Sequence, residues 1–356
     1  MPGLNHKSYD IVVGIPSYNN SNTIKYVVET AAKGLGQFFP SLRGCIINSD
    51  GGSTDNTEEV FYSASSSGTD LLSFRYRGIS GKGSAMRSIM EKALTLDAQA
   101  VVFLDSDLRS VEPFWIDRLA RPIFEKNAAY VTPYYIRHKY DGTITNSICY
   151  PLTTALYGKK IRQPIGGDFG VGREMLDYYI SVSEETWKSD VSRFGIDIWM
   201  TTSAINEARG SIYQAAFESP IYGEVAAGVP ESVEVDLGNM ILKCYEGIKE
   251  QEGFIGEILG SEISHELFLL GKANAMIDDD LWVRIIYRIA SRYRNVALRK
   301  RLIELLVPLY FGRVASFVSR TGEMTQEDAE KETDRLLEKF VNAKDELISI
   351  WEKSSE

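Results

Sequence analysis

The stretch Ala100-Val-Val-Phe-Leu-Asp-Ser-Asp107 decides the fold, because it is a short apolar run that ends in two carboxylates. Its β-branched and aromatic residues are typical of a central strand in a parallel sheet. Residues i and i+2 of an extended chain point to the same side, so Asp105 and Asp107 can face one point if the backbone stays extended through Ser106. Two carboxylates at the end of a parallel strand suit Mg²⁺ or Mn²⁺ carrying a diphosphate. The alternative is an aspartate-rich turn.

The first two thirds of the chain repeat the order strand, polar loop, helix. The expected strands are 11–16, 42–48, 71–77, 100–105, 129–136 and 211–217, and the expected helices are 23–33, 56–64, 84–96, 115–125, 147–160, 173–181 and 198–209. This alternation predicts an α/β fold with a mostly parallel sheet. Because right-handed crossovers bring the loops after parallel strands to one edge, we expect Tyr18, Asp50, Lys82 and Asp105 to gather there.

The pattern becomes almost wholly helical from Leu237 onward. We therefore predict an α/β domain over 1–236 and a helical region over 237–356. The run Thr325-Gln-Glu-Asp328 predicts a helix start. Amphipathic, charge-laced helices can pair two chains, so a homodimer is a hypothesis.

Composition excludes some classes of protein. The 356 residues are 44% hydrophobic and carry a formal net charge of -10, which argues against a general nucleic-acid binder. The three cysteines lie far apart in the chain, so we expect buried free thiols. No segment approaches the roughly 20 apolar residues of a membrane span. The polar N-terminus lacks the apolar core of a signal peptide, so the expected location is cytoplasmic.

Two loops after strands are candidates for holding a nucleoside. Pro16-Ser-Tyr-Asn19 offers Tyr18 for stacking and Asn19 for hydrogen bonding to a base, and Asp50 ends the next strand and can accept from a base N–H. The alternative is a pair of surface turns with a capping aspartate. For Asp55 we favour a helix cap.

Gly81-Lys-Gly83 stands at the start of a predicted helix. Its glycines let the backbone approach an anion, the helix N-terminus attracts that anion, and Lys82 adds a point charge. An ordinary glycine turn with a solvated lysine is the alternative. The spacing of a P-loop is absent.

Three later runs are candidates for holding a sugar and an acceptor. Gln163-Pro-Ile-Gly-Gly-Asp168 offers backbone N–H groups at Gly166 and Gly167 and an acceptor at Asp168, and Gly195-Ile-Asp197 offers another carboxylate. A tight turn and a helix cap are their alternatives. Arg137 and His138 follow a strand and can receive an anionic acceptor, or they form a solvated basic pair. With three histidines in the chain, no Ser-His-Asp or Cys-His arrangement can be argued.

In this order and spacing, the motifs resemble nucleotide-sugar glycosyltransferases of the GT-A fold. The glycine-bearing runs, Arg137-His138 and the stretch from Asp236-Leu237 to Cys244 narrow the resemblance to the retaining mannosylglycerate synthase and glucosyl-3-phosphoglycerate synthase group. The resemblance covers roughly residues 10–250, and six motifs in order are much more specific than one.

The resemblance implies a role for each motif. A UDP- or GDP-hexose donor would be bound with Mg²⁺ or Mn²⁺, and the acceptor would be a small anion such as glycerate or 3-phosphoglycerate. Metal binding is implied for Asp107 and Asp105, contact with the diphosphate for Lys82, and nucleoside binding for the loops that carry Tyr18 and Asp50. The implied residues at the donor sugar are Gly166, Gly167 and Asp197.

The sequence departs from the group at two places. The group supplies a third metal ligand, a histidine, from the loop after the late strand, whereas residues 218–224 hold none. Glu218, Tyr222, Glu224 or water are the candidate substitutes. Ser84 also replaces an acidic residue that is common in the group. Two alternatives follow: an inverting enzyme with Asp168 or Asp197 as base, and a binding protein without turnover.

Overall fold

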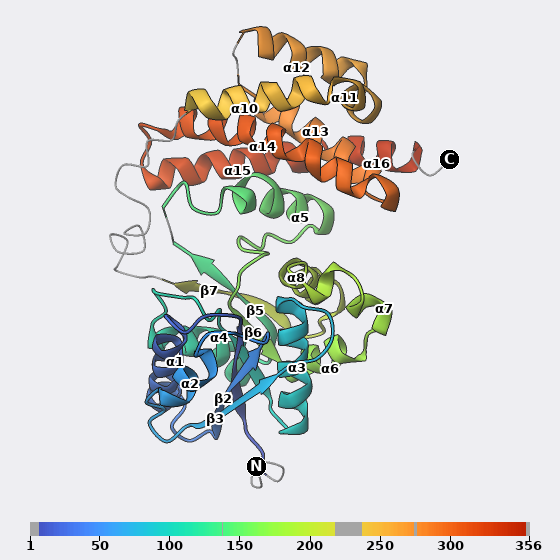
Figure 1. Cartoon of the computed structure of the whole chain (residues 1–356). Coiled ribbons are helices and arrows are strands. Elements are labelled where there is room, and N and C mark those ends of the chain that lie inside the picture. Colours follow the sequence, from blue (N-terminus) through green and yellow to red (C-terminus); the bar gives the residue numbers. More distant parts are fainter. Residues whose placement is uncertain (1–6, 137, 218–236, 274–275, 354–356) are drawn as a thin grey trace. The chain divides into compact units, whose positions relative to one another are not determined.

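A mostly parallel sheet organises the N-terminal part of the chain (Figure 1). The computed structural model describes residues 7–136, 138–217, 237–273 and 276–353. Among these residues the sheet has seven strands in the order β3-β2-β1-β4-β6-β5-β7. The strands are β1 Ile11–Ser17, β2 Gly44–Asp50, β3 Asp70–Arg75, β4 Ala100–Phe103, β5 Ala128–Tyr135, β6 Phe169–Gly172 and β7 Ser211–Phe217. The predicted α/β class with a mostly parallel sheet is confirmed, and β1 pairs in parallel with β2 and with β4.

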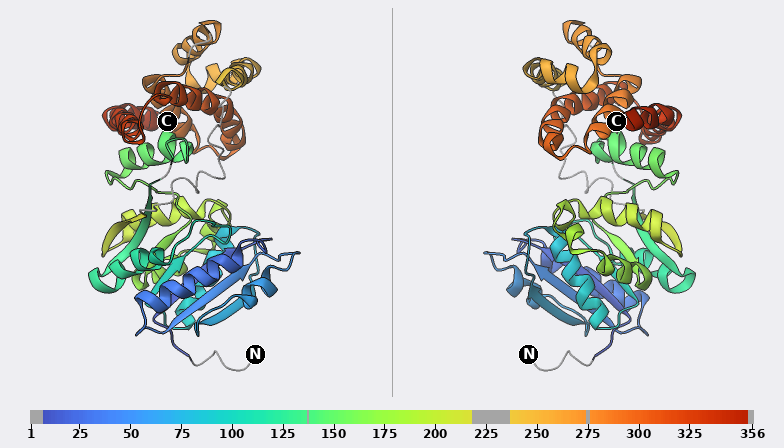
Figure 2. Two further views of the ribbon diagram at one scale, coloured as in Figure 1. Left: turned by 90° about the vertical axis from the view of Figure 1, so that its left-hand side faces the viewer. Right: turned by 90° about the vertical axis from the view of Figure 1, so that its right-hand side faces the viewer.

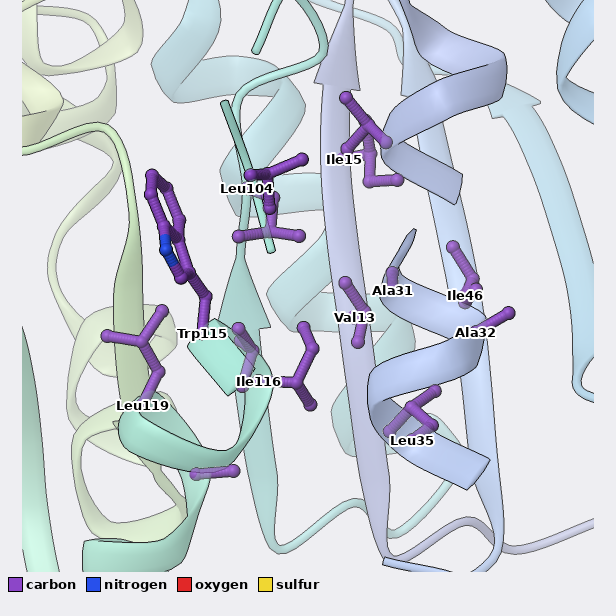
Figure 3. Close-up of a cluster of buried hydrophobic side chains, with 14 of the residues drawn as sticks. Val13, Ile15, Ala31, Ala32, Leu35, Ile46, Leu104, Trp115, Ile116 and Leu119 are labelled. Atoms are coloured by element: carbon purple, nitrogen blue, oxygen red, sulfur yellow. The ribbon is translucent and has the colours of Figure 1, made fainter. Parts of the chain in front are cut away.

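Helices cover both faces of this sheet, which explains why its central strands are apolar throughout. The helices of this unit are α1 Ile24–Phe38, α2 Thr57–Ser63, α3 Lys82–Thr95, α4 Pro113–Lys126, α6 Arg173–Ser181, α7 Glu184–Trp187 and α8 Ile196–Glu207, and a 3₁₀ turn spans Asp190–Ser192. Val13 and Ile15 pack with α1 and α4 in the cluster of Figure 3. Val12 points to the other face and packs with Met86 and Ile89 of α3.

Strand β6 was expected to be part of a loop. It is antiparallel, lies between β4 and β5, and has four residues, of which two are glycine. A Cβ at Gly170 would overlap the carbonyl oxygen of Leu119, so the glycine permits a close approach of α4. A run this short with so few side chains gives no readable strand pattern.

Strand β4 ends at Phe103, two residues before the expected end at Asp105. The condition of an extended backbone through Ser106 is therefore not met, because residues 106 and 107 lie in a turn, which was the alternative. The antiparallel register pairs Phe103 with Phe169, the last pair on this side. The residues that follow β4 therefore run beside the residues that precede β6.

The second unit is helical and contains residues 138–160 as well as the C-terminal helices. Its elements are a π-helical turn Thr145–Cys149, α5 Tyr150–Tyr157, α10 Leu237–Glu250, α11 Glu252–Leu259, α12 Ser261–Ala273, α13 Asp279–Arg292, a 3₁₀ turn Val296–Leu298, α14 Arg299–Thr321, α15 Gln326–Asn342 and α16 Lys344–Lys353. Figure 2 shows α5, in green, alongside the orange and red C-terminal helices. The buried Trp282 donates its indole N–H to the carbonyl of Ser147 at 2.8 Å. Residues 138–160 were expected in the α/β domain, so the predicted division is wrong for this segment.

Helix α14 bears on the expectation that no segment can span a membrane. Together with the preceding turn, Val296–Thr321 is long and apolar enough to do so by length and composition. Of its most apolar window, 61% is buried within the protein, as in the core helix of a folded unit. The expectation that no segment has the length and composition of a membrane span is therefore wrong for this helix.

Candidate functional site

Three loops after parallel strands are tied together at the carboxyl edge of the sheet, as the sequence predicted. The Ser106 hydroxyl donates to Asn20 Oδ1 at 2.8 Å, which joins the loops after β4 and β1. Asn19 accepts a hydrogen bond from the Thr54 N–H at 2.8 Å and donates its own N–H to Ser53 Oγ at 2.8 Å. The loops after β1 and β2 are thereby joined as well.

Asp50 has a structural role in this arrangement. Its Oδ1 accepts from the N–H groups of Gly52 and Ser53, each at 2.7 Å. Its Oδ2 accepts from the hydroxyls of Ser53 at 2.6 Å and Ser17 at 3.3 Å. A carboxylate has about four acceptor sites. The turn role that we kept as an alternative is therefore present, and accepting from a base would require one of these bonds to exchange.

Asp55 supports the start of α2, although the N-cap position that we expected for it is held by Asn56, the next residue. It accepts from the N–H of Thr57 at 3.1 Å and from the Thr57 hydroxyl, and its other oxygen accepts from the Ser21 N–H at 3.1 Å. The hydrogen bond from Thr57 is the main reason that the pKa of Asp55 falls to about 2.

Tyr18 is the exposed aromatic side chain of this edge. It is 60% exposed, and its ring lies close to Gly51, where an added Cβ would stand 3.2 Å from Tyr18 Cδ2. Pro16 is buried in β1, in register with Ser49. The structure therefore leaves the Tyr18 ring open for stacking and gives Pro16 a place in the sheet.

Lys82, the first residue of α3, lies between two carboxylates. Its Nζ is 2.8 Å from Asp105 Oδ1 and 3.3 Å from Asp197, although 23 and 115 residues separate it from them along the chain. The Lys82 side chain is 13% exposed. Burial alone would lower the pKa of Lys82, but Asp105 and Asp197 outweigh burial and raise it above its ordinary value. Burial raises the pKa of Asp197 to about 6, although Lys82 opposes that rise.

The glycines around Lys82 serve contacts within the protein. A Cβ at Gly83 would overlap the carbonyl oxygen of Val191, and the Gly83 N–H donates to the carbonyl of Arg193 at 2.9 Å. The Gly81 N–H donates to the Tyr76 hydroxyl at 3.0 Å. The expected use of both glycines for a bound anion is not what the structure records, because α3 packs against residues 191–193 instead. The charge of Lys82 and the start of α3 remain for that role.

The adjacent glycines 166 and 167 make room for their neighbours. A Cβ at Gly167 would overlap Asp105 Oδ2, and a Cβ at Gly166 would lie 2.6 Å from Pro133 Cγ. Asp168 is 1% exposed and accepts from the Asp105 N–H at 3.3 Å and from the Tyr135 hydroxyl. Burial, and after it the charge of Asp105, raises the pKa of Asp168 well above its usual range.

Sequence reasoning missed Tyr135. The only signal for it was its place at the carboxyl end of a predicted strand. Arg137 and residues 218–224, with Glu218, Tyr222 and Glu224, lie outside the described residues. His138 belongs to the helical unit, where its Nδ1 accepts from the Tyr140 N–H at 3.3 Å.

The carboxylates at the end of β4 differ in their surroundings. Asp105 is paired with Lys82, whereas Asp107 is exposed and makes no hydrogen bond or ion pair to the described residues. Within the described ranges, no three His, Cys, Asp or Glu side chains gather as a metal site. Mg²⁺ commonly uses one or two carboxylates together with substrate phosphates. Asp107 is therefore the carboxylate that is free to meet a metal arriving with a diphosphate, whereas Asp105 is already paired with Lys82.

Comparison with known proteins adds the following. Residues 12–178 match the model of Glycosyl transferase family 2. A glucosyl-3-phosphoglycerate synthase of Mycolicibacterium paratuberculosis is 27% identical over an alignment of 188 positions, and the match covers 47% of this chain and 54% of that protein. The chain thus spans 54% of the length of this curated relative.

Solved structures of glucosyl-3-phosphoglycerate synthase from Mycobacterium tuberculosis are similar over part of the chain. The complex with Mn²⁺, UDP and phosphoglyceric acid has a TM-score of 0.44 and 23% identity, covering 61% of this chain and 74% of that one. The complex with phosphoglyceric acid has a TM-score of 0.45 and 22% identity, covering 62% and 75%.

Proposed function

We propose that the chain is a nucleotide-sugar glycosyltransferase, because residues 12–178 match the model of Glycosyl transferase family 2. It moves a hexose from a UDP- or GDP-hexose to a small anionic acceptor, glycerate or 3-phosphoglycerate, with retention of the anomeric configuration. The observation that carries the proposal is the placement of Lys82 at the start of α3, between Asp105 and Asp197.

Lys82 would stabilise the departing nucleoside diphosphate. Breaking the bond between sugar and diphosphate builds negative charge on the leaving group, and a fixed positive charge in a partly dry site lowers the free energy of that transition state. Asp105 and Asp197 keep Lys82 protonated. A Mg²⁺ or Mn²⁺ ion held by Asp107 and Asp105 would neutralise the same diphosphate.

Other residues of the edge would orient the donor. The exposed ring of Tyr18 would stack on the base, with Asn19 and Asp50 shaping the loops beneath it. Asp197 would accept from a hydroxyl of the sugar beside Lys82. Arg137 would receive the anionic acceptor. Retention would follow from attack on the face from which the diphosphate leaves, without a protein nucleophile.

The first experiment measures acceptor-dependent release of nucleoside diphosphate. The wild-type chain is assayed with UDP-glucose and GDP-mannose, with glycerate and 3-phosphoglycerate, and with and without Mn²⁺ or Mg²⁺. We expect Lys82→Ala to lower kcat by about 10²–10³-fold, the loss seen when one group that stabilises transition-state charge is removed. Lys33→Ala is the matched control, because Lys33 is exposed on α1. Equal rates for metal-free and metal-loaded enzyme would contradict the proposed use of a metal.

An inverting reaction is the second candidate, and the pKa of Asp197 favours it. A carboxylate with a pKa of about 6 is suited to act as a general base near neutral pH. In that case kcat/KM would rise as the pH increases through about 6, because Asp197 must be ionised, and Asp197→Asn would remove this rise. NMR of the product's anomeric proton separates the two candidates: the donor configuration supports retention, and the opposite configuration supports inversion.

A further inference from the structure

Asp168 lies where two antiparallel strands separate. The register of β4 with β6 ends at the pair Phe103–Phe169, so Asp168 and Gly167 come beside the backbone that leaves β4. This backbone carries Asp105, whose carboxylate reaches Lys82. Whatever fixes the chain at this point also fixes the direction of the Asp105 side chain.

Both oxygens of Asp168 are used within the protein. Oδ1 accepts from the Asp105 backbone N–H at 3.3 Å, and Oδ2 accepts from the hydroxyl of Tyr135 at the end of β5. The residue is 1% exposed, so its carboxylate has no access to a substrate in solution. A base or a sugar ligand needs the opposite, an oxygen that faces the reacting molecule.

We propose that Asp168 and Tyr135 are positioning residues that hold the Asp105 backbone and thereby aim the Asp105 carboxylate at Lys82. The Tyr135 hydroxyl holds the Asp168 carboxylate at the end of β5. The same carboxylate binds the backbone N–H of Asp105 in the segment after β4. The absence of a side chain at Gly167 completes the arrangement, since a Cβ there would overlap Asp105 Oδ2. Asp168 is therefore neither the base nor a ligand of the donor sugar.

The first arm of the test does not depend on activity. Backbone hydrogen exchange at the Asp105 amide is measured by NMR in the wild type, Asp168→Asn, Asp168→Ala and Tyr135→Phe. An asparagine oxygen still accepts from this N–H, so Asp168→Asn should keep the wild-type exchange rate. Asp168→Ala should exchange about tenfold faster, as expected for the loss of one buried hydrogen bond. Tyr135→Phe should fall between the two.

The control variant for Tyr135 is Thr132→Val on the same strand. The Thr132 side chain is buried, and its hydroxyl has no hydrogen-bond partner in the described part of the chain. The exchange rate at Asp105 should not change in this variant. If Asp168→Ala does not fold, the comparison of Tyr135→Phe with Thr132→Val still decides the proposal, because equal exchange in these two variants would overturn it.

The second arm rests on the proposed function and uses transfer kinetics. Asp168→Asn should keep kcat within about fivefold of the wild type, because an asparagine still accepts from the Asp105 N–H and loses only part of the interaction with Tyr135. In a double-mutant cycle, Asp168→Ala should add no further loss on an Asp105→Ala background, because Asp168 acts through Asp105. Additive losses, or an Asp168→Asn variant as defective as Asp168→Ala with normal exchange at Asp105, would overturn the proposal. A wild type without transfer on any donor would refute the proposed function and leave the exchange arm decisive for the positioning role.

Discussion

At the scale of single residues, the loop after β2 depends on Asp50. One buried carboxylate accepts from two backbone N–H groups and two hydroxyls. We expect Asp50→Ala to lower the free energy of unfolding by about 1–3 kcal/mol, because several partly buried donors lose their partner. Chemical denaturation measures this. The control is Asp177→Ala, whose carboxylate pairs with Arg173 on the surface. Equal losses in the two variants would refute a special role for Asp50.

At the scale of elements, the contact of α3 with residues 191–193 is what sets Lys82 beside Asp197. Gly83 is the closest point of this contact, and a methyl group there meets backbone rather than a flexible side chain. We expect Gly83→Ala to destabilise the protein by about 1–3 kcal/mol, as overpacking does. The rate of sugar transfer should fall by more than this loss of stability alone explains, because α3 carries Lys82.

Gly36→Ala is the matched control for this prediction. Gly36 is also a helical glycine, in α1, but an added Cβ has no neighbour within 4 Å. This variant should be stabilised by roughly 0.5–1 kcal/mol, since alanine favours the helix and loses less backbone entropy on folding. Thermal unfolding of the two variants side by side measures the difference, and a destabilised Gly36→Ala would show that the assay reports something other than space at the glycine.

At the scale of the whole molecule, the helical unit contains a buried ion cluster of its own. Asp279 is 6% exposed and pairs with the buried Arg313 and with Arg320 at 2.7 Å. Burial alone would raise the pKa of Asp279, but Arg320 and Arg313 outweigh burial and lower it. A lowered pKa in the folded state contributes stability above the unfolded pKa, and this contribution is lost as the pH falls through the folded value.

We expect Asp279→Asn to cost about 3–5 kcal/mol, because it leaves the charge of Arg313 buried without compensation. The neighbouring Asp280 pairs with Lys339 on the surface, so Asp280→Asn should cost less than about 1 kcal/mol. Urea unfolding at pH 7 measures both. Below the unfolded pKa of about 4, the difference between Asp279→Asn and the wild type should shrink, since the wild-type carboxyl becomes protonated. A difference that stays constant down to pH 2 would contradict the assignment.

Much of this architecture was predictable from the sequence, since apolar runs separated by polar loops mark the parallel strands and place Asp105 near Lys82. Two kinds of feature were not. Strand β6 has too few side chains to show the alternation of apolar and polar residues that marks a strand. The role of Gly83 depends on contact with Val191, more than a hundred residues away in the chain. Residues 147–160 were expected to be helical, but their sequence could not show that they pack with the C-terminal unit. The proposed positioning of Asp105 by Asp168 and Tyr135 could not be predicted without the register of β4, β6 and β5.

The excursion of the chain between β5 and β6 limits how the protein can be dissected. The polypeptide leaves the sheet after β5, contributes α5 to the helical unit, and comes back to lay β6 into the middle of the sheet. Cleavage at a single peptide bond therefore cannot separate the two units. A fragment that ends before α10 still contains α5 but lacks the C-terminal helices that bury its apolar face. Isolating the sheet requires excising 138–160 and bridging the gap with a short linker.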